Sequence, residues 1–221
     1  KAQPHFVWSL SSANMPGIGQ TWSAPVLANV HITTPVSTQN SQRLVLIMGG
    51  GYDPTEDGSD ITGPYVTSNS IGNRIFIVDA ITGARLWSAG PTGSGASLEL
   101  ARMDHAIPGG ISVIDLNSDG YADRLYAGDM AGQVWRFDIH NGQNTANLVT
   151  GGVLASLGTH DDNPHTIANA RRFYSTPDIS LITPRGSAPY LNIAIGSGYR
   201  GHPLNTGIQD RFYALRDFNI A

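Results

Sequence analysis

The fold is decided by residues 111–138, which read ISVIDLNSDGYADRLYAGDMAGQVWRFD. Two short runs of β-branched, aromatic or alternating residues, 111–114 and 124–127, flank a polar loop, and a third run follows at 133–138. Runs of this length and pattern are typical of strands, not of the helix pair that encloses an EF-hand loop. The stretch therefore predicts strands joined by a polar loop.

Oxygen-bearing side chains occupy alternate positions of this loop, at Asp115, Asn117, Asp119 and Asp123. A hard cation such as calcium needs several oxygen ligands at short range, and alternate side chains of a tight loop can converge on one point. The backbone carbonyl of Tyr121 fills the remaining alternate position, and Gly120 permits the sharp turn because glycine takes positive φ readily. The predicted metal ligands are Asp115, Asn117, Asp119, the Tyr121 carbonyl and Asp123.

The loop departs from an EF-hand at its twelfth position, which is Tyr126 where an EF-hand has a bidentate Glu. Asp123, at the ninth position, has to act as the closing ligand. The alternative is a turn without metal, since Asp, Asn and Gly favour turns in any case. Without a cation the three acids repel each other at close range, which favours the calcium loop.

Composition bounds the class of protein. The 221 residues are 40% hydrophobic and 14% charged, with 26 Gly, 13 Pro and no Cys. Low charge and abundant turn residues indicate many short strands, and the missing Cys excludes disulfides and thiolate metal sites. The net charge of −4 gives no support for nucleic-acid binding. No run of about 18 apolar residues occurs, so no membrane span is expected.

A unit of strand, Gly-rich turn, loop and strand occurs twice. In the first copy Arg43–Met48 leads through Gly49-Gly50-Gly51-Tyr52 to Asn73–Asp79, and in the second Tyr190–Ile195 leads through Gly196-Ser197-Gly198-Tyr199 to Asp210–Leu215. Residues 111–138 form a third, variant copy. Repeated strand clusters favour a β-propeller. At about 40–50 residues per blade we expect four or five blades, too few to close a ring. We therefore expect residues 1–221 to be a propeller domain or part of one, cut from a longer protein.

The segment Asp79–Trp87, DAITGARLW, has two interpretations. Such turns recur with a Trp in the blades of quinone-dependent dehydrogenases, so an enzyme of this type is the alternative function. The interpretation we favour is structural: a tight hairpin whose Trp87 packs between neighbouring blades, because a large flat side chain buries much area.

The calcium loop, the YAGDMAGQVWRFD run at 126–138 and the GGGYD turn at 49–53 together resemble the C-terminal β-propeller domain of the PilC/PilY family, the tip-associated adhesins of bacterial type IV pili. The resemblance implies an all-β, modified quinoprotein-like propeller with calcium in a nine-residue loop. It also implies that calcium occupancy governs pilus extension and retraction, and that the larger protein supports adhesion and twitching motility. No catalytic residue is implied.

The resemblance further implies the partners and the location. The expected partners are the type IV pilus machinery or minor pilins, and a host or surface receptor, with the long loops 53–70 and 159–170 as binding surfaces. The expected location is the cell surface at the pilus tip, exported and associated with the outer membrane. The Arg-Gly-Asp motif of some family members is absent, and Arg185-Gly186-Ser187 is the nearest match. A purely structural role for calcium, as a staple of the loop, is a second alternative.

Two further polar clusters are expected to be structural. His160–His165 contains two His and two Asp, but a Pro-containing polar loop of this kind is more often solvated than metal-bound. Arg171-Arg172-Phe173-Tyr174 is expected to pack at a strand edge, with the two Arg stems along apolar surface and their guanidinium groups in solvent.

Overall fold

The computed structural model describes residues 3–34, 37–58, 68–158, 160 and 166–220. These residues contain twelve strands in three sheets and two short 3-10 helices, η1 (Pro54–Asp57) and η2 (Ile167–Asn169). They contain no α-helix, so the all-β class is confirmed. Across the same ranges, no helix has the length and apolarity that a membrane crossing requires.

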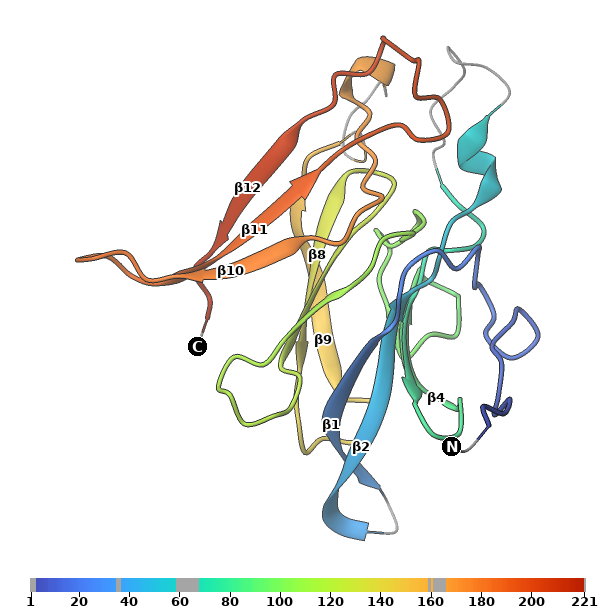
Figure 1. The fold of residues 1–221 in the computed structure, drawn as a ribbon, viewed down its shortest axis with the longest axis vertical. Helices are drawn as coiled ribbons and strands as arrows, with labels where there is room; N and C mark the ends of the chain where they lie inside the picture. The colour runs from blue at the N-terminus through green and yellow to red at the C-terminus, as the bar shows by residue number, and fades with distance from the viewer. Residues whose placement is uncertain (1–2, 35–36, 59–67, 159, 161–165, 221) are drawn as a thin grey trace.

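The first sheet has five strands that pair in chain order: β1 (Val26–Thr34), β2 (Ser37–Gly49), β3 (Ile75–Asp79), β4 (Arg85–Gly90) and β5 (Leu98–Glu99). All neighbours are antiparallel except β4 and β5. β1 and β2 form a long hairpin at one end of the molecule (Figure 1). β1 is an edge strand, which leaves one of its two edges for contacts outside this sheet.

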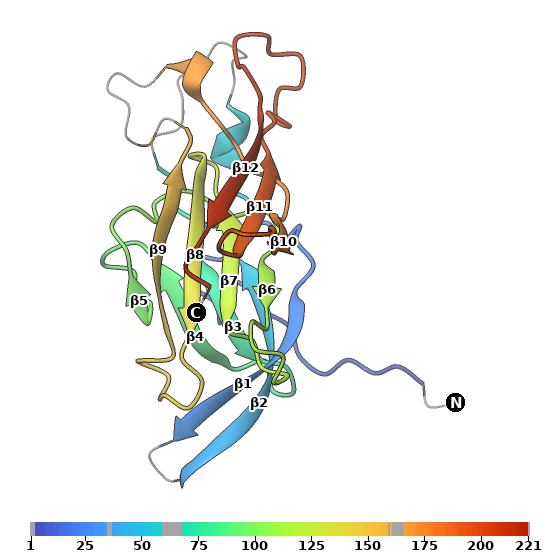
Figure 2. The ribbon, with the colours of Figure 1, turned by 90° about the vertical axis from the view of Figure 1, so that its left-hand side faces the viewer.

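The second and third sheets are antiparallel and also pair in chain order. The second contains β6 (Ser112–Ile114), β7 (Arg124–Gly128), β8 (Gln133–Ile139) and β9 (Val149–Ser156), and the third contains β10 (Asp178–Ile182), β11 (Tyr190–Gly196) and β12 (Phe212–Asp217). In Figure 2 the four strands of the second sheet lie side by side, and the third sheet packs against one face of them. The three sheets do not close into a ring or barrel within the described residues.

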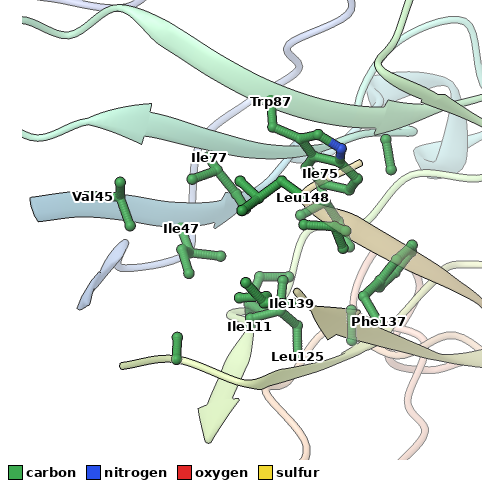
Figure 3. Packing of buried hydrophobic residues seen from close by; sticks show 14 of the residues in the cluster. Val45, Ile47, Ile75, Ile77, Trp87, Ile111, Leu125, Phe137, Ile139 and Leu148 are labelled. Carbon is green, nitrogen blue, oxygen red and sulfur yellow. The ribbon is translucent and has the colours of Figure 1, made fainter. Parts of the chain in front are cut away.

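Alternation of side chains along β7 explains why the second sheet lies between the other two. Leu125 points toward the first sheet and packs in a cluster with Ile77, Trp87 and Phe137 (Figure 3). Tyr126, the next residue, points the other way and packs with residues of the third sheet. Successive residues of a strand face opposite sides, so both faces of β7 are buried and all five of its residues are buried.

The structure corrects the expected number of blades. Four or five units were expected from chain length, but the described residues form three sheets, so that expectation is wrong. The first sheet alone extends from residue 26 to residue 99, with a long connection between β2 and β3. The strand segments of all three predicted copies overlap strands β2, β3, β6, β7, β8, β11 and β12, and several of them start one or two residues before the observed strand.

Candidate metal centre

The predicted calcium loop joins two neighbouring strands, as expected. β6 and β7 pair antiparallel with Ile114 opposite Arg124, and the loop 115–123 connects them. The backbone N–H of Asp123 donates to the carbonyl of Ile114 at 2.8 Å, and the carbonyl of Asp123 accepts from the N–H of Ile139 at 2.7 Å. Asp123, the predicted closing ligand, is therefore anchored in the sheet at the foot of the loop.

Asp115, the first predicted ligand, organises the backbone of the loop. Its Oδ1 accepts hydrogen bonds from the N–H groups of Ser118 at 2.6 Å and Asp119 at 3.3 Å. Its Oδ2 accepts from the N–H of Gly120 at 2.8 Å. Gly120 has φ of +89° and Ser118 has φ of +63°, so the chain turns through the left-handed region twice. The expected positive φ at Gly120 is confirmed.

The other predicted ligands repeat this local pattern. The side-chain oxygens of Asn117 and Asp119 each accept from the N–H two residues later, at 2.9 Å in both cases. Asn117 Nδ2 also donates to Asp119 Oδ2 at 3.1 Å. Asp123 Oδ2 accepts from the N–H of Leu116 at 2.8 Å. The backbone N–H groups thus orient every predicted side-chain ligand.

The donor set fits calcium in its chemistry. Three carboxylates, one amide and one carbonyl supply only oxygen, which is the ligand type a hard cation prefers, and Asp115, Asn117 and Asp119 are exposed. The side chains are not gathered on one point in this conformation: among the described residues, no three His, Asp or Glu side chains form a group that could hold a metal ion. Calcium bound here has to draw these side chains together.

One side of the loop contacts the first sheet. The N–H of Ala122 donates to the carbonyl of Asn29 in β1 at 2.9 Å. Asn141, in the turn between β8 and β9, donates from Nδ2 to the carbonyl of Ala122 at 3.0 Å. The rings of Tyr121 and His31 are in contact, with their centroids 3.9 Å apart and their planes tilted by 41°. Asn29 Nδ2 also donates to the carbonyl of Gly120 at 3.5 Å, across 91 residues of chain. No local sequence signal indicates contacts between segments so far apart.

The other side of the loop borders a cavity of about 530 Å³ that reaches the end of the third sheet. Loop residues Leu116, Asn117 and Asp123 line it together with Arg124, Arg136, Asp138, Ile139, His140, Asn219 and Ile220. The loop therefore lies where all three sheets approach one another.

Three of the lining residues, Arg124, Arg136 and Asp138, belong to a network of ion pairs. Asp138 accepts from Arg124 Nε at 2.6 Å and from Arg136 Nη2 at 2.9 Å, and Arg136 Nη1 lies 3.0 Å from Asp217 Oδ2. Tyr126 donates its hydroxyl to Asp217 at 2.6 Å. Burial, and then this bond to a carboxylate, raise the pKa of Tyr126. The pairs join β7 and β8 to β12 beside the loop.

Of the His160–His165 cluster, which was expected to be structural, the structure describes His160 alone. Residues 161–165 of the His160–His165 cluster lie outside the described residues, as do parts of the long loops 53–70 and 159–170. His160 Nε2 lies 3.4 Å from Asp104, which also pairs with His105 at 2.8 Å.

The expectation for the two arginines at 171 and 172 is wrong. Arg171 and Arg172 are both 3% exposed, because each guanidinium has polar partners inside. Arg172 Nε donates to the buried Glu56 at 3.0 Å and its guanidinium covers the ring of Tyr199. Arg171 donates to the hydroxyl of Tyr213.

The Asp79–Trp87 segment forms the hairpin between β3 and β4. Asp79 Oδ1 accepts from the N–H groups of Ile81 and Thr82. Trp87 is fully buried and contacts Phe137 of the second sheet edge to face, with ring centroids 6.2 Å apart. The structural interpretation of this segment, a Trp that locks neighbouring sheets, is confirmed.

Comparisons with known proteins point in one direction. No protein-family model matches the chain. The type IV pilus biogenesis factor PilY1 of Pseudomonas aeruginosa PAO1 is 27% identical over 143 residues, which cover 62% of this chain and 9% of that protein. The PilY1 homolog of Xylella fastidiosa is 25% identical over 137 residues, covering 62% of this chain and 8% of that protein.

A solved structure shares the fold. The crystal structure of the C-terminal domain of P. aeruginosa PilY1 matches 96% of this chain with a TM-score of 0.60 and 20% identity. The match covers 40% of that crystallised chain. The matched region thus spans a small part of the curated relatives and less than half of the solved domain.

Proposed function

Because the chain is homologous to the type IV pilus biogenesis factor PilY1 and has the fold of that protein's C-terminal domain, we propose that it is a calcium-binding domain of a type IV pilus-associated protein. The family resemblance based on the loop and on residues 126–138 is confirmed by this homology. Calcium binding, the regulatory role and the partners are proposals.

The proposed architecture is a modified β-propeller, with each antiparallel sheet as one blade. Strands that pair in chain order and sheets that pack face to face support this. The solved domain is longer than this chain, since the match covers 40% of it, which leaves chain in that domain for further blades. Edges of the three sheets are then protected by radial packing.

The observation that carries the proposed function is the hydrogen-bonded backbone of the loop. Asp115 holds three N–H groups, Gly120 adopts positive φ, and Asp123 is fixed in the ladder. A bound calcium ion supplies the positive charge that lets the three carboxylates converge. The chain's residues supply the oxygen ligands: Asp115, Asn117, Asp119, the Tyr121 carbonyl and Asp123.

We propose that calcium occupancy of this loop selects between two states of the domain and thereby governs pilus extension and retraction, twitching motility and adhesion. A ligand shifts such an equilibrium only by its difference in affinity for the two states. The proposed partners are the pilus machinery or minor pilins and a surface receptor. The proposed location is the exported, outer-membrane-associated pilus tip, and the domain is not an enzyme.

The test compares bacteria that carry Asp123→Ala in the full-length protein with bacteria that carry Asp178→Ala. Asp178 is an exposed acid at the start of β10, in the third sheet. We expect Asp123→Ala to change surface piliation and the diameter of twitching zones, and Asp178→Ala to leave both as in the wild type. The regulatory role is contradicted if the Asp123→Ala strain, with the protein present at wild-type level, shows wild-type piliation and twitching. Calcium then has at most a structural role in the loop.

A further inference from the structure

The edge of β1 that does not pair with β2 bonds to two segments of the second sheet. Residues 29, 31 and 33 alternate along the strand, so their backbone groups point to the same edge. The carbonyl of Asn29 accepts from Ala122 in the loop, at 2.9 Å. The N–H of His31 donates to Asn141 Oδ1 at 2.8 Å, and the N–H of Thr33 donates to the carbonyl of Gln143 at 3.0 Å. The edge of β1 is therefore covered by the loop and by the turn between β8 and β9.

The contact at Asn29 acts on a predicted calcium ligand through one peptide group. The N–H of Ala122 and the carbonyl of Tyr121 belong to the same planar unit and point in opposite directions across a trans peptide. Since the N–H donates to Asn29, the Tyr121 oxygen points away from β1. A donated N–H also polarises its own peptide group, which strengthens the carbonyl oxygen as a ligand.

Asn141 joins the same two elements through its side chain. Its Nδ2 donates to the carbonyl of Ala122 and its Oδ1 accepts from the N–H of His31. The peptide group before Ala122 is therefore held by the backbone of β1. The peptide group after Ala122 is held by the side chain of Asn141, which also bonds to β1. The tilted ring contact of His31 with Tyr121 adds a third contact between the strand and the loop.

We propose that the docking of the β1–β2 hairpin on the second sheet is the element that responds to calcium, with Asn29 and Asn141 as positioning residues for the Tyr121 carbonyl. This inference rests on the proposed calcium site. Calcium fixes the Tyr121–Ala122 peptide, and this peptide fixes β1. By thermodynamic linkage, docking of β1 raises calcium affinity by the same factor by which calcium favours docking.

The first test is amide hydrogen exchange of the wild-type protein, resolved by NMR, with and without calcium. We expect calcium to slow exchange at the amides that cross this interface, those of His31, Thr33 and Ala122. Amides of β11 in the third sheet serve as the internal control and are expected to exchange at equal rates in both conditions. Equal rates at the three interface amides under calcium saturation overturn the proposal.

The second test is calcium affinity, measured by calorimetry, in Asn141→Ala and in the matched control Asn147→Ala. Asn147 lies in the same connection and is exposed, and its backbone N–H bonds within the turn. Loss of a group that orients a metal ligand commonly lowers affinity about 10- to 100-fold. We expect a loss in this range for Asn141→Ala and wild-type affinity for Asn147→Ala. Equal affinity in both variants overturns the proposal.

The outcomes separate this inference from the proposed function. If the wild type binds no calcium, the proposed function fails and the inference fails with it. If calcium binds through Asp123 but neither β1 exchange nor the Asn141→Ala affinity changes, the calcium site stands and the role of β1 is refuted. Should Asn141→Ala not fold, the exchange experiment on the wild type still decides the question.

Discussion

Replacing Asp129 by Asn tests the account of the turn between β7 and β8. Asp129 is fully buried and its carboxylate accepts four hydrogen bonds. Oδ1 accepts from the N–H groups of Ala131 and Gln133, and Oδ2 accepts from Gln133 Nε2 and Trp135 Nε1, all at 2.8 to 2.9 Å. One side chain thus satisfies four buried donors.

In Asp129→Asn the retained oxygen keeps the two backbone bonds, but the new NH₂ group faces two donors. Gln133 cannot rotate its amide to help, because its Oε1 accepts from Arg102 Nε and its Nε2 donates to the Arg102 carbonyl. Each buried donor left without a partner costs about 1–3 kcal/mol, so two cost about 2–6 kcal/mol of unfolding free energy. A small domain has about 5–15 kcal/mol in total.

The assay is urea unfolding followed by tryptophan fluorescence, with the exposed Asp178→Asn as the matched control. The control is expected to stay within about 0.5 kcal/mol of the wild type, as surface substitutions usually do. A loss below about 1 kcal/mol for Asp129→Asn refutes the reasoning, because it means that the carboxylate does not satisfy these donors.

Three further changes test other parts of the account. Arg172→Ala leaves the buried Glu56 without its ion-pair partner and is expected to cost about 3–5 kcal/mol in chemical denaturation, as broken buried pairs do. Gly120→Ala meets no neighbour within 4 Å but forces alanine into φ of +89°, so a thermal melt should show a loss of about 1–2 kcal/mol from strain alone. Burial by itself raises the pKa of Asp53, but hydrogen bonds from Thr55, Ser70 and Ile71 outweigh it and lower the pKa. The stability this provides is present above the unfolded pKa of about 3.9 and is lost as pH falls through the lower folded value, so Asp53→Asn should flatten the acid limb of a stability profile.

Sequence patterns predicted the parts of the fold that depend on local chemistry. The β-branched and aromatic run at 75–78 lies in β3 and the apolar run at 44–48 lies in β2. All four residues 75–78 are buried, because Ile75 and Ile77 pack in one cluster and Phe76 and Val78 in another. The loop at 115–123 was predicted together with the strands around it, because each of its turns is made by hydrogen bonds between near neighbours.

Four strands, β1, β5, β9 and β10, were not predicted from the sequence. In β1 and β9 the apolar signal is diluted. β1 does alternate, with Val30 and Ile32 buried, but the alternate residues Asn29 and His31 are polar and contact the loop. β9 contains Gly151 and Gly152, which weaken strand propensity. The number of sheets was overestimated because long connections consume chain without adding strands.

Contacts between distant segments were beyond any local pattern. Arg172 is buried because Glu56, 116 residues earlier in the chain, lies beside it. Asn141 holds the loop and β1 together only after three separate elements have come together. Such contacts depend on how the sheets pack, and the packing is set by the whole core rather than by one segment.

The measurement that tests the central claim most directly is a calorimetric calcium titration of the wild-type protein and of Asp123→Ala. The account predicts one equivalent of calcium for the wild type and none for the variant, while the unfolding transition of the variant without calcium stays close to that of the wild type. Identical isotherms for the two proteins, or no binding by the wild type, contradict the assignment of loop 115–123 as the calcium site.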